Sequence, residues 1–309
     1  PSQAVRNAFA NAMTELARER NDVCLLSGDI GNRMFDRYKE VAPTRFMNCG
    51  IAEANMMSMA AGMALSGLRP VVYTITPFTT TRCLEQIRIG IAYHEAPVVI
   101  VGTGSGLSYS ELGTTHHSLE DIAILRSIPN IQVCAPSDPL ELVAQLRQAI
   151  DEGKPTYIRI GKKGEKNLFS EKAKLGIGRS QLIKPGKNVL LLGVGPILNE
   201  ALKAKESLMQ HGIDLAIASM GGIKPIDNNF LHNMVKENYT RWISLEEHYK
   251  IGGLGSRLLE WLSEQEIKDI SLTRLGIDDF FINELGNQDY VRRVQGIDAK
   301  GIEDAVKNL

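Results

Sequence analysis

The sequence predicts an α/β protein made of two doubly wound domains, the first of them built on a parallel sheet. In this chain of 309 residues, short apolar runs alternate with helical patterns. The apolar runs are continuous, which is typical of strands buried on both faces. One stretch rich in Lys and Gly interrupts the alternation. We therefore place a first domain at residues 1–165, a linker at 166–187 and a smaller second domain at 188–309.

The elements of the first domain follow from periodicity and β-branched content. Helical periodicity over residues 3–20 is followed by a short apolar run that ends in Gly-Asp. Further strands are expected at 70–76, 97–104, 131–136 and 156–160. Helices are expected from Glu53 onward and at 80–94, 118–127 and 138–152.

The second domain repeats the alternation on a smaller scale. Strands are expected at 188–195, 214–219, 241–247 and 271–277. Helices are expected near 197–211 and after the glycine-rich segment 252–256. This order again predicts an α/β unit.

The charge balance, the cysteine spacing and the lengths of the apolar runs indicate which partners and which cellular compartment to expect. Lys plus Arg (35) nearly balance Asp plus Glu (36), and no basic block is interleaved with aromatic residues, so neither nucleic acid nor an anionic membrane is an expected partner. The four cysteines show no CxxC spacing, which is typical of reduced thiols in an intracellular protein. The N-terminal segment 1–20 is an amphipathic helix pattern without the apolar core of a signal peptide, and no apolar run has the length of a membrane span. We expect a cytoplasmic protein.

Glu53 begins a segment that otherwise contains mainly Ala, Gly, Met and Ser and is expected to be buried. Burial of an unpaired carboxylate is costly, so this acid should be neutral, paired or directed at a ligand. A plainer interpretation is that it complements the helix dipole from the first turn. The residues alone leave both interpretations open.

Two glycine-containing loops are candidate ligand sites. Segment 27–33, SGDIGNR, lacks both common phosphate-loop patterns, so a strand-end turn with Asp29 as a capping residue is the better interpretation. Segment 102–121 follows a strand and contains His116 and His117. These histidines either bind substrate at the carboxyl end of the sheet or simply precede a helix capped by Ser118. No spacing marks them as metal ligands.

Three segments of the first domain, RFMNCGIAE (45–53), ITPFTTTRCLEQIRIGIAY (75–93) and GTTHHSLEDIAILRSIPNIQV (113–133), resemble the pyrimidine-binding domain of the transketolase family. Segments 244–258 and 275–302 resemble the C-terminal domain of transketolases and of deoxyxylulose-phosphate synthases. The resemblance covers nearly the whole chain. It implies thiamine diphosphate as the cofactor and the transfer of a two-carbon ketol unit from a ketose to an aldose.

The resemblance also assigns residues to the cofactor. It implies that Glu53 is the catalytic acid that hydrogen-bonds the aminopyrimidine ring. Phe78 matches the aromatic residue that stacks on this ring. The resemblance places Ile51 and Asp29 near the cofactor as well.

Substrate residues follow in the same way. His116 matches the catalytic histidine that contacts the donor ketose, His117 stands where glutamine is usual, and Arg159 matches a basic residue that binds the substrate phosphate. Leu112 replaces an acid that commonly reads sugar hydroxyls. Loss of that polar partner predicts a non-standard sugar.

One family feature is missing from the sequence. Transketolases hold the diphosphate and a metal ion through a Gly-Asp-Gly motif followed by an asparagine, and this chain has neither at the required spacing. The resemblance therefore implies the second subunit of a split transketolase, with Mg²⁺ or Ca²⁺ bound by an N-terminal partner subunit in an α2β2 heterotetramer. We predict no metal ligand in this chain. The alternatives are the β subunit of a 2-oxoacid dehydrogenase and a non-catalytic family member.

Overall fold

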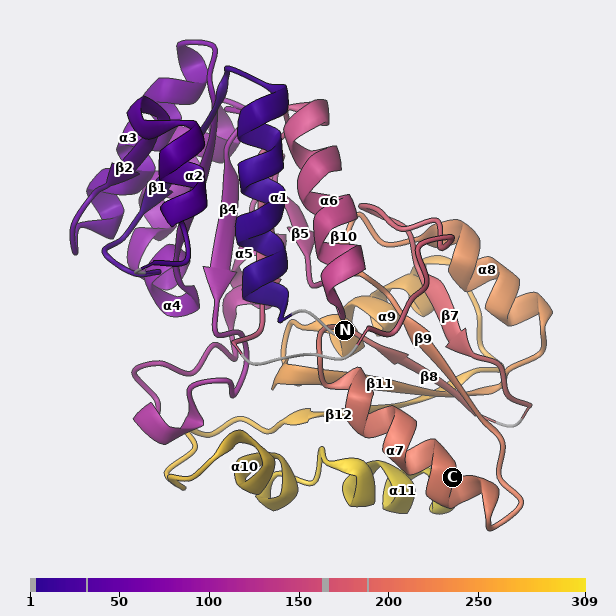
Figure 1. Ribbon diagram of the computed structural model, residues 1–309. Helices are drawn as coiled ribbons and strands as arrows, with labels where there is room; N and C mark the ends of the chain where they lie inside the picture. The colour runs from indigo at the N-terminus through magenta and orange to yellow at the C-terminus, as the bar shows by residue number, and fades with distance from the viewer. Residues whose placement is uncertain (1–3, 32, 163–166, 188) are drawn as a thin grey trace.

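A computed structural model describes the chain except for residues 1–3, 32, 163–166 and 188. It contains two sheets, each covered by helices on both faces (Figure 1). The two-domain α/β fold predicted from the sequence is confirmed. No helix among the described residues is long and apolar enough to cross a membrane.

The first sheet has seven strands in the order β10-β5-β6-β4-β3-β1-β2, and all neighbours are parallel except β10 and β5. Its strands are β1 (Val23–Ser27), β2 (Phe46–Asn48), β3 (Arg69–Ile75), β4 (Val99–Thr103), β5 (Gln132–Cys134), β6 (Thr156–Ile160) and β10 (Gly222–Lys224). The central strands β1, β4 and β6 are buried along their whole length. Burial on both faces explains their continuous apolar sequences.

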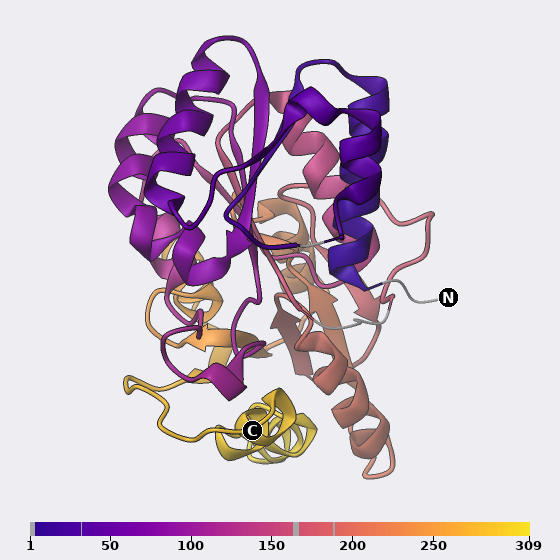
Figure 2. The ribbon, with the colours of Figure 1, turned by 60° about the vertical axis from the view of Figure 1, so that its left-hand side comes forward.

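Helices cover this sheet in two layers (Figure 2). One layer consists of α1 (Val5–Glu19), α2 (Asp36–Val41) and α6 (Pro139–Glu152). The other consists of α3 (Glu53–Leu65), the π-helix η3 (Gln86–Tyr93) and α5 (Asp121–Arg126). Short helical turns form parts of the connections: η1 (Pro43–Arg45), α4 (Thr76–Thr79), η2 (Thr81–Cys83) and η4 (Ser110–Leu112).

The second sheet has the strand order β12-β11-β8-β9-β7, with β7 antiparallel to β9. Its strands are β7 (Gln181–Lys184), β8 (Val189–Gly193), β9 (Leu215–Ser219), β11 (Arg241–Tyr249) and β12 (Ser271–Ile277). Helices α8 (Asn228–Lys236) and α9 (Leu254–Glu264) pack on the face that joins the core of the first domain. The other face carries α7 (Leu198–Met209), α10 (Gln288–Val294) and α11 (Ala299–Lys307).

Several elements and boundaries differ from those expected from the sequence. Strand β7 lies inside the predicted linker 166–187, and β10 from the second domain extends the first sheet. Helix α5 begins at Asp121, so Ser118 is not its cap. The backbone amide of Ser118 instead donates to the carbonyl of Gly106 (3.0 Å), which closes the loop after β4.

Candidate active site

Glu53 is the first residue of α3 and is only 4% exposed. Its carboxylate accepts a hydrogen bond from Nη1 of Arg82 at 2.9 Å. The Arg82 side chain is 47% exposed, so the pair opens toward solvent on one side. The acid therefore has a partner that the sequence analysis did not assign, although Arg82 closes the segment PFTTTR that carries Phe78.

A flat surface lies beside this carboxylate. The guanidinium carbon of Arg82 is 4.1 Å from the centre of the Phe78 ring. The ring of His116 meets the same phenyl ring edge-on, with centroids 5.4 Å apart. Phe78 follows β3 and His116 follows β4, so the site forms where parallel strands end, the usual ligand position in such sheets.

The two histidines differ in environment. Burial, followed by the charges of Arg82 and Lys162, lowers the pKa of the half-buried His116 ring below its ordinary range. His117 is 4% exposed, and burial is the main cause that lowers its pKa. Both rings are therefore mostly uncharged at neutral pH, a state in which one ring nitrogen donates and the other accepts.

A pocket of about 540 Å³ lies at this point and is lined in part by Phe78, Arg82, His117 and Glu120. Among the described residues, Nε2 of His117 has no hydrogen-bond partner although it is buried. Burial of an unsatisfied polar atom is unfavourable, so such an atom in a pocket wall is suited to a polar ligand.

Asp29 and Ile51 lie at the ends of β1 and β2. The Asp29 carboxylate accepts from Nδ2 of Asn48 at 2.9 Å, and Oδ1 of that asparagine accepts from the Gly50 amide. Asp29 has a left-handed backbone (φ 57°), in keeping with a strand-end turn. Ile51 is 79% exposed just before Glu53, so the structure leaves its side chain available for contact.

Arg159, which was expected to bind a substrate phosphate, is not among the residues that line this pocket. The side chain is 3% exposed, and its Nε donates to the buried carboxylate of Asp121 at 2.9 Å. Its Nη2 donates to the carbonyls of Ser118 and Glu247. These contacts place the guanidinium between the domains and leave it covered.

A second, basic pocket was not found from the sequence. It measures about 430 Å³ and is lined by Arg6, Arg33 and Lys162, among others. In the described part of the chain, none of these three cations forms an ion pair with a carboxylate. Lys162 Nζ lies 4.1 Å from the centre of the Tyr109 ring.

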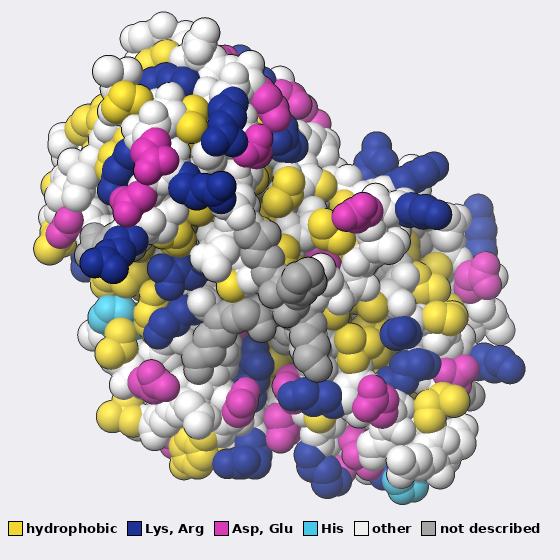
Figure 3. All heavy atoms as spheres, in the orientation of Figure 1, with side chains coloured by type: hydrophobic (Ala, Val, Ile, Leu, Met, Phe, Trp, Pro, Cys, Tyr) yellow, Lys and Arg dark blue, Asp and Glu magenta, His cyan; other side chains and the backbone are white. Residues whose placement is uncertain are grey.

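This basic pocket adjoins the histidines, because the rings of Tyr109 and His116 are 6.0 Å apart. Figure 3 shows Lys and Arg side chains gathered on the lower part of the first domain on this face. Unpaired cations beside a polar pocket attract an anionic ligand.

Comparison with known proteins decides the family. The transketolase pyrimidine binding domain matches residues 2–164, and the transketolase C-terminal domain matches residues 178–302. The chain belongs to the transketolase family. The resemblance predicted from its motifs is therefore confirmed.

The similarity to individual transketolase subunits extends over nearly the whole chain. A subunit of the apulose-4-phosphate transketolase of Phocaeicola vulgatus is 30% identical, over 97% of this chain and 95% of the relative. The 6-deoxy-6-sulfo-D-fructose transketolase subunit SqwH of Clostridium sp. (strain MSTE9) is 31% identical, over 99% and 94%. A solved structure described as a split gene transketolase, inactive beta4 tetramer, has a TM-score of 0.88 at 31% identity and covers 100% of this chain and 98% of that chain.

Proposed function

We propose that this chain is the pyrimidine-binding subunit of a split, thiamine diphosphate-dependent transketolase that transfers a two-carbon ketol unit from a ketose to an aldose. Family membership implies the cofactor, and similar proteins are named as single subunits of transketolases. The observation that carries the proposal is the buried Glu53 carboxylate beside the Phe78 ring.

The residues present fit the aminopyrimidine part of the cofactor. The Arg82 guanidinium is flat, donates to Glu53 at 2.9 Å and lies over Phe78 at 4.1 Å. A flat aromatic ring with a protonated nitrogen can likewise donate a hydrogen bond to Glu53 and stack on Phe78. The aminopyrimidine ring would therefore take the place that this guanidinium holds. Thiamine diphosphate, when bound, would supply the carbon nucleophile needed for cleavage of the bond between C2 and C3 of a ketose. Ile51 and Asp29 would flank the bound cofactor.

The chain's own residues then have distinct tasks. Glu53 holds or releases a proton at the pyrimidine nitrogen. His116, uncharged near neutral pH, hydrogen-bonds the ketose near its reacting carbon. The unpaired Nε2 of His117 offers a second polar contact to the sugar.

We further propose that an N-terminal partner subunit holds the diphosphate and its Mg²⁺ or Ca²⁺, in an α2β2 heterotetramer. Among the described residues, no group of three or more His, Cys, Asp or Glu side chains could hold a metal ion. Apolar side chains are exposed on and around α3 and η3, which offers a surface for such a partner. They are Ile51, Met59, Leu65, Ile89 and Tyr93. We expect this assembly to work in the cytoplasm.

The sugar is expected to be anionic and non-standard. Arg6, Arg33 and Lys162 form a site for a phosphate or sulfonate, in place of the expected Arg159. Leu112 is exposed at the rim of the histidine loop, where relatives commonly carry an acid. The two similar subunits are named for a phosphorylated and a sulfonated sugar.

Reconstitution with the partner subunit tests the proposal. Turnover would be measured with ketose donors and, separately, with 2-oxoacids plus a dye acceptor. We expect activity with an anionic ketose only in the presence of both subunits and thiamine diphosphate. Activity restricted to 2-oxoacids would instead support a dehydrogenase β subunit, and a complex that binds cofactor but turns over neither class would support a non-catalytic family member.

A further inference from the structure

The loop after β4, residues 104–118, carries both active-site histidines and lies beyond the edge of its own sheet. In Figure 1 it runs from the carboxyl end of β4 down toward α10. Its two ends are anchored in the other domain. Leu107 and the adjoining Leu119 are fully buried in the core of the C-terminal domain, among side chains of β8, β11, α7 and α10.

Glu247, in β11, is the polar side chain at the first anchor. Its carboxylate accepts from the backbone amide of Leu107 at 3.3 Å and is paired with Arg292 of α10. Gly106 lies directly against it, because a Cβ atom there would be 2.5 Å from Cβ of Glu247. The loop backbone and this side chain are therefore in close contact, which only glycine permits at this φ of 60°.

Arg159, in β6, holds the second anchor. One guanidinium binds Asp121 at the start of α5 (2.9 Å), the carbonyl of Ser118 at the end of the loop (2.9 Å) and the carbonyl of Glu247 (3.2 Å). Asp121 also accepts from the Tyr157 hydroxyl at 2.6 Å. Buried, charge-assisted contacts of this kind fix geometry because each lost partner leaves a desolvated group.

We propose that Arg159 and Glu247 form an interdomain clamp through which the C-terminal domain holds the histidine loop in its active position. Both are positioning residues that act through His116 and His117. The clamp gives the C-terminal domain a part in catalysis, and this catalytic role rests on the proposed function. The contacts that form the clamp are independent of the proposed function.

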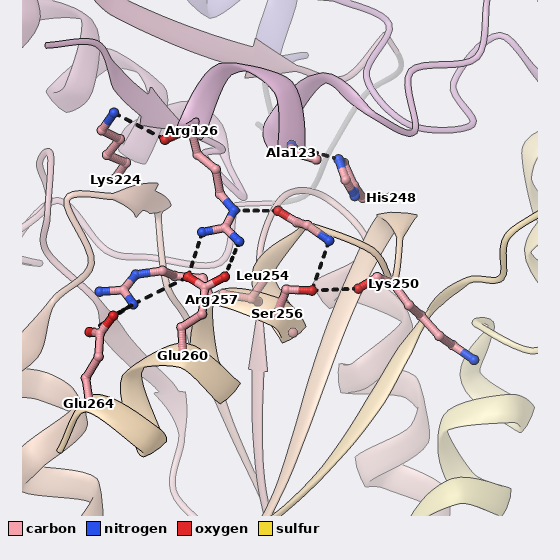
Figure 4. Close-up of polar contacts among 12 residues, drawn as sticks. Ala123, Arg126, Lys224, His248, Lys250, Leu254, Ser256, Arg257, Glu260 and Glu264 are labelled. Atoms are coloured by element: carbon pink, nitrogen blue, oxygen red, sulfur yellow. Dashed lines mark hydrogen bonds and ion pairs between the residues drawn. The ribbon is translucent and has the colours of Figure 1, made fainter. Parts of the chain in front are cut away.

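A second group of interdomain contacts provides the control (Figure 4). Arg126, in α5, donates to the carbonyl of Gly252 and to Glu260 of α9, at 2.8 Å from its Nη1. The backbone amide of Ala123 donates to Nε2 of His248. These contacts also join the domains, but they touch the helix after the loop.

Hydrogen exchange of the full chain tests the clamp without any substrate. The variants are Arg159→Lys, which retains the charge but not the three-way contact, and Glu247→Gln, which retains the shape. Because local opening controls exchange, we expect amides in 104–118 to exchange about tenfold faster or more in both, with α3 unchanged. Glu260→Gln should leave 104–118 unchanged. Unaltered exchange in that loop in both folded clamp variants would overturn the clamp.

Steady-state kinetics of the assembled enzyme separates positioning from substrate binding. Misplacement of a catalytic group mainly lowers kcat, so Arg159→Lys should lower kcat roughly 10- to 100-fold with xylulose 5-phosphate and with xylulose alike. A rise in KM for the phosphorylated ketose alone would show phosphate binding by Arg159 and contradict the proposal. If the wild-type complex turned over no ketose, the proposed function would fail while hydrogen exchange would still decide the clamp.

Discussion

Removal of one cation from the basic pocket should weaken binding of anionic sugars only. Lys162 lies just after β6, beside the Tyr109 ring, with Arg6 and Arg33 in the same pocket. A hydrogen bond to a charged group contributes about 1.5–3 kcal/mol. Because the pocket is open to water, we expect Lys162→Met to lose about 2 kcal/mol of binding free energy for the anionic sugar. This loss corresponds to a roughly 30-fold rise in KM.

The assay compares a phosphorylated ketose with the same sugar lacking phosphate, at low and at high salt. KM should rise for the phosphorylated sugar, with kcat nearly unchanged, and the effect should shrink at high salt because screening weakens exposed charges. Lys154→Met is the matched control, since Lys154 precedes the opposite end of β6. An equal rise in KM for both sugars, or no rise, would refute the anion site.

Two further predictions concern stability. Burial raises the pKa of Glu141 to about 8 from its ordinary 4.5, so the folded state holds an extra proton between these values and stability should fall as pH rises through this range. Glu141→Gln should therefore remove this pH dependence and stabilise the protein at pH 9 by up to about 5 kcal/mol. Urea unfolding at pH 5 and pH 9 measures the effect. An unchanged dependence of stability on pH would contradict the prediction. Gly106→Ala should destabilise by about 2–3 kcal/mol, because it combines left-handed backbone strain with the contact to Glu247. Gly195→Ala, with similar φ and nothing within 4 Å, should cost only about 1 kcal/mol, and equal losses would show that the contact is unimportant.

Strands could be predicted from the sequence where their own residues form a recognisable apolar pattern. The predicted limits 156–160 and 271–277 are those of β6 and β12. In β6 the reason is a fully buried run rich in β-branched residues. Strand β10 was missed, since three residues gain strand structure only by pairing with β5, far away in the chain. For the same reason β7 was included in the linker.

The site was predicted in part. Family motifs indicated Glu53, Phe78 and His116, and the structure brings the three together around Arg82. Arg82 itself was missed because an arginine in a helical turn gives no sign of which acid it will meet.

Arg159, the cation expected to bind the substrate phosphate, is buried and paired with Asp121. Arg159 lies within a strand whose every residue is buried, whereas Lys162 follows the strand's end. A charged residue inside a fully buried strand must find protein partners, so this burial was the available signal.

Glu53 is proposed to perform acid–base chemistry on the cofactor, and the decisive measurement is the turnover of Glu53→Gln. The variant would be assembled with the partner subunit and compared with Glu15→Gln, a change at an exposed glutamate of α1 paired with Arg18. Loss of a general acid–base group predicts a 10²- to 10⁴-fold fall in ketol transfer, with assembly intact and the control unaffected. Turnover by Glu53→Gln at the wild-type rate would contradict an acid–base role for Glu53.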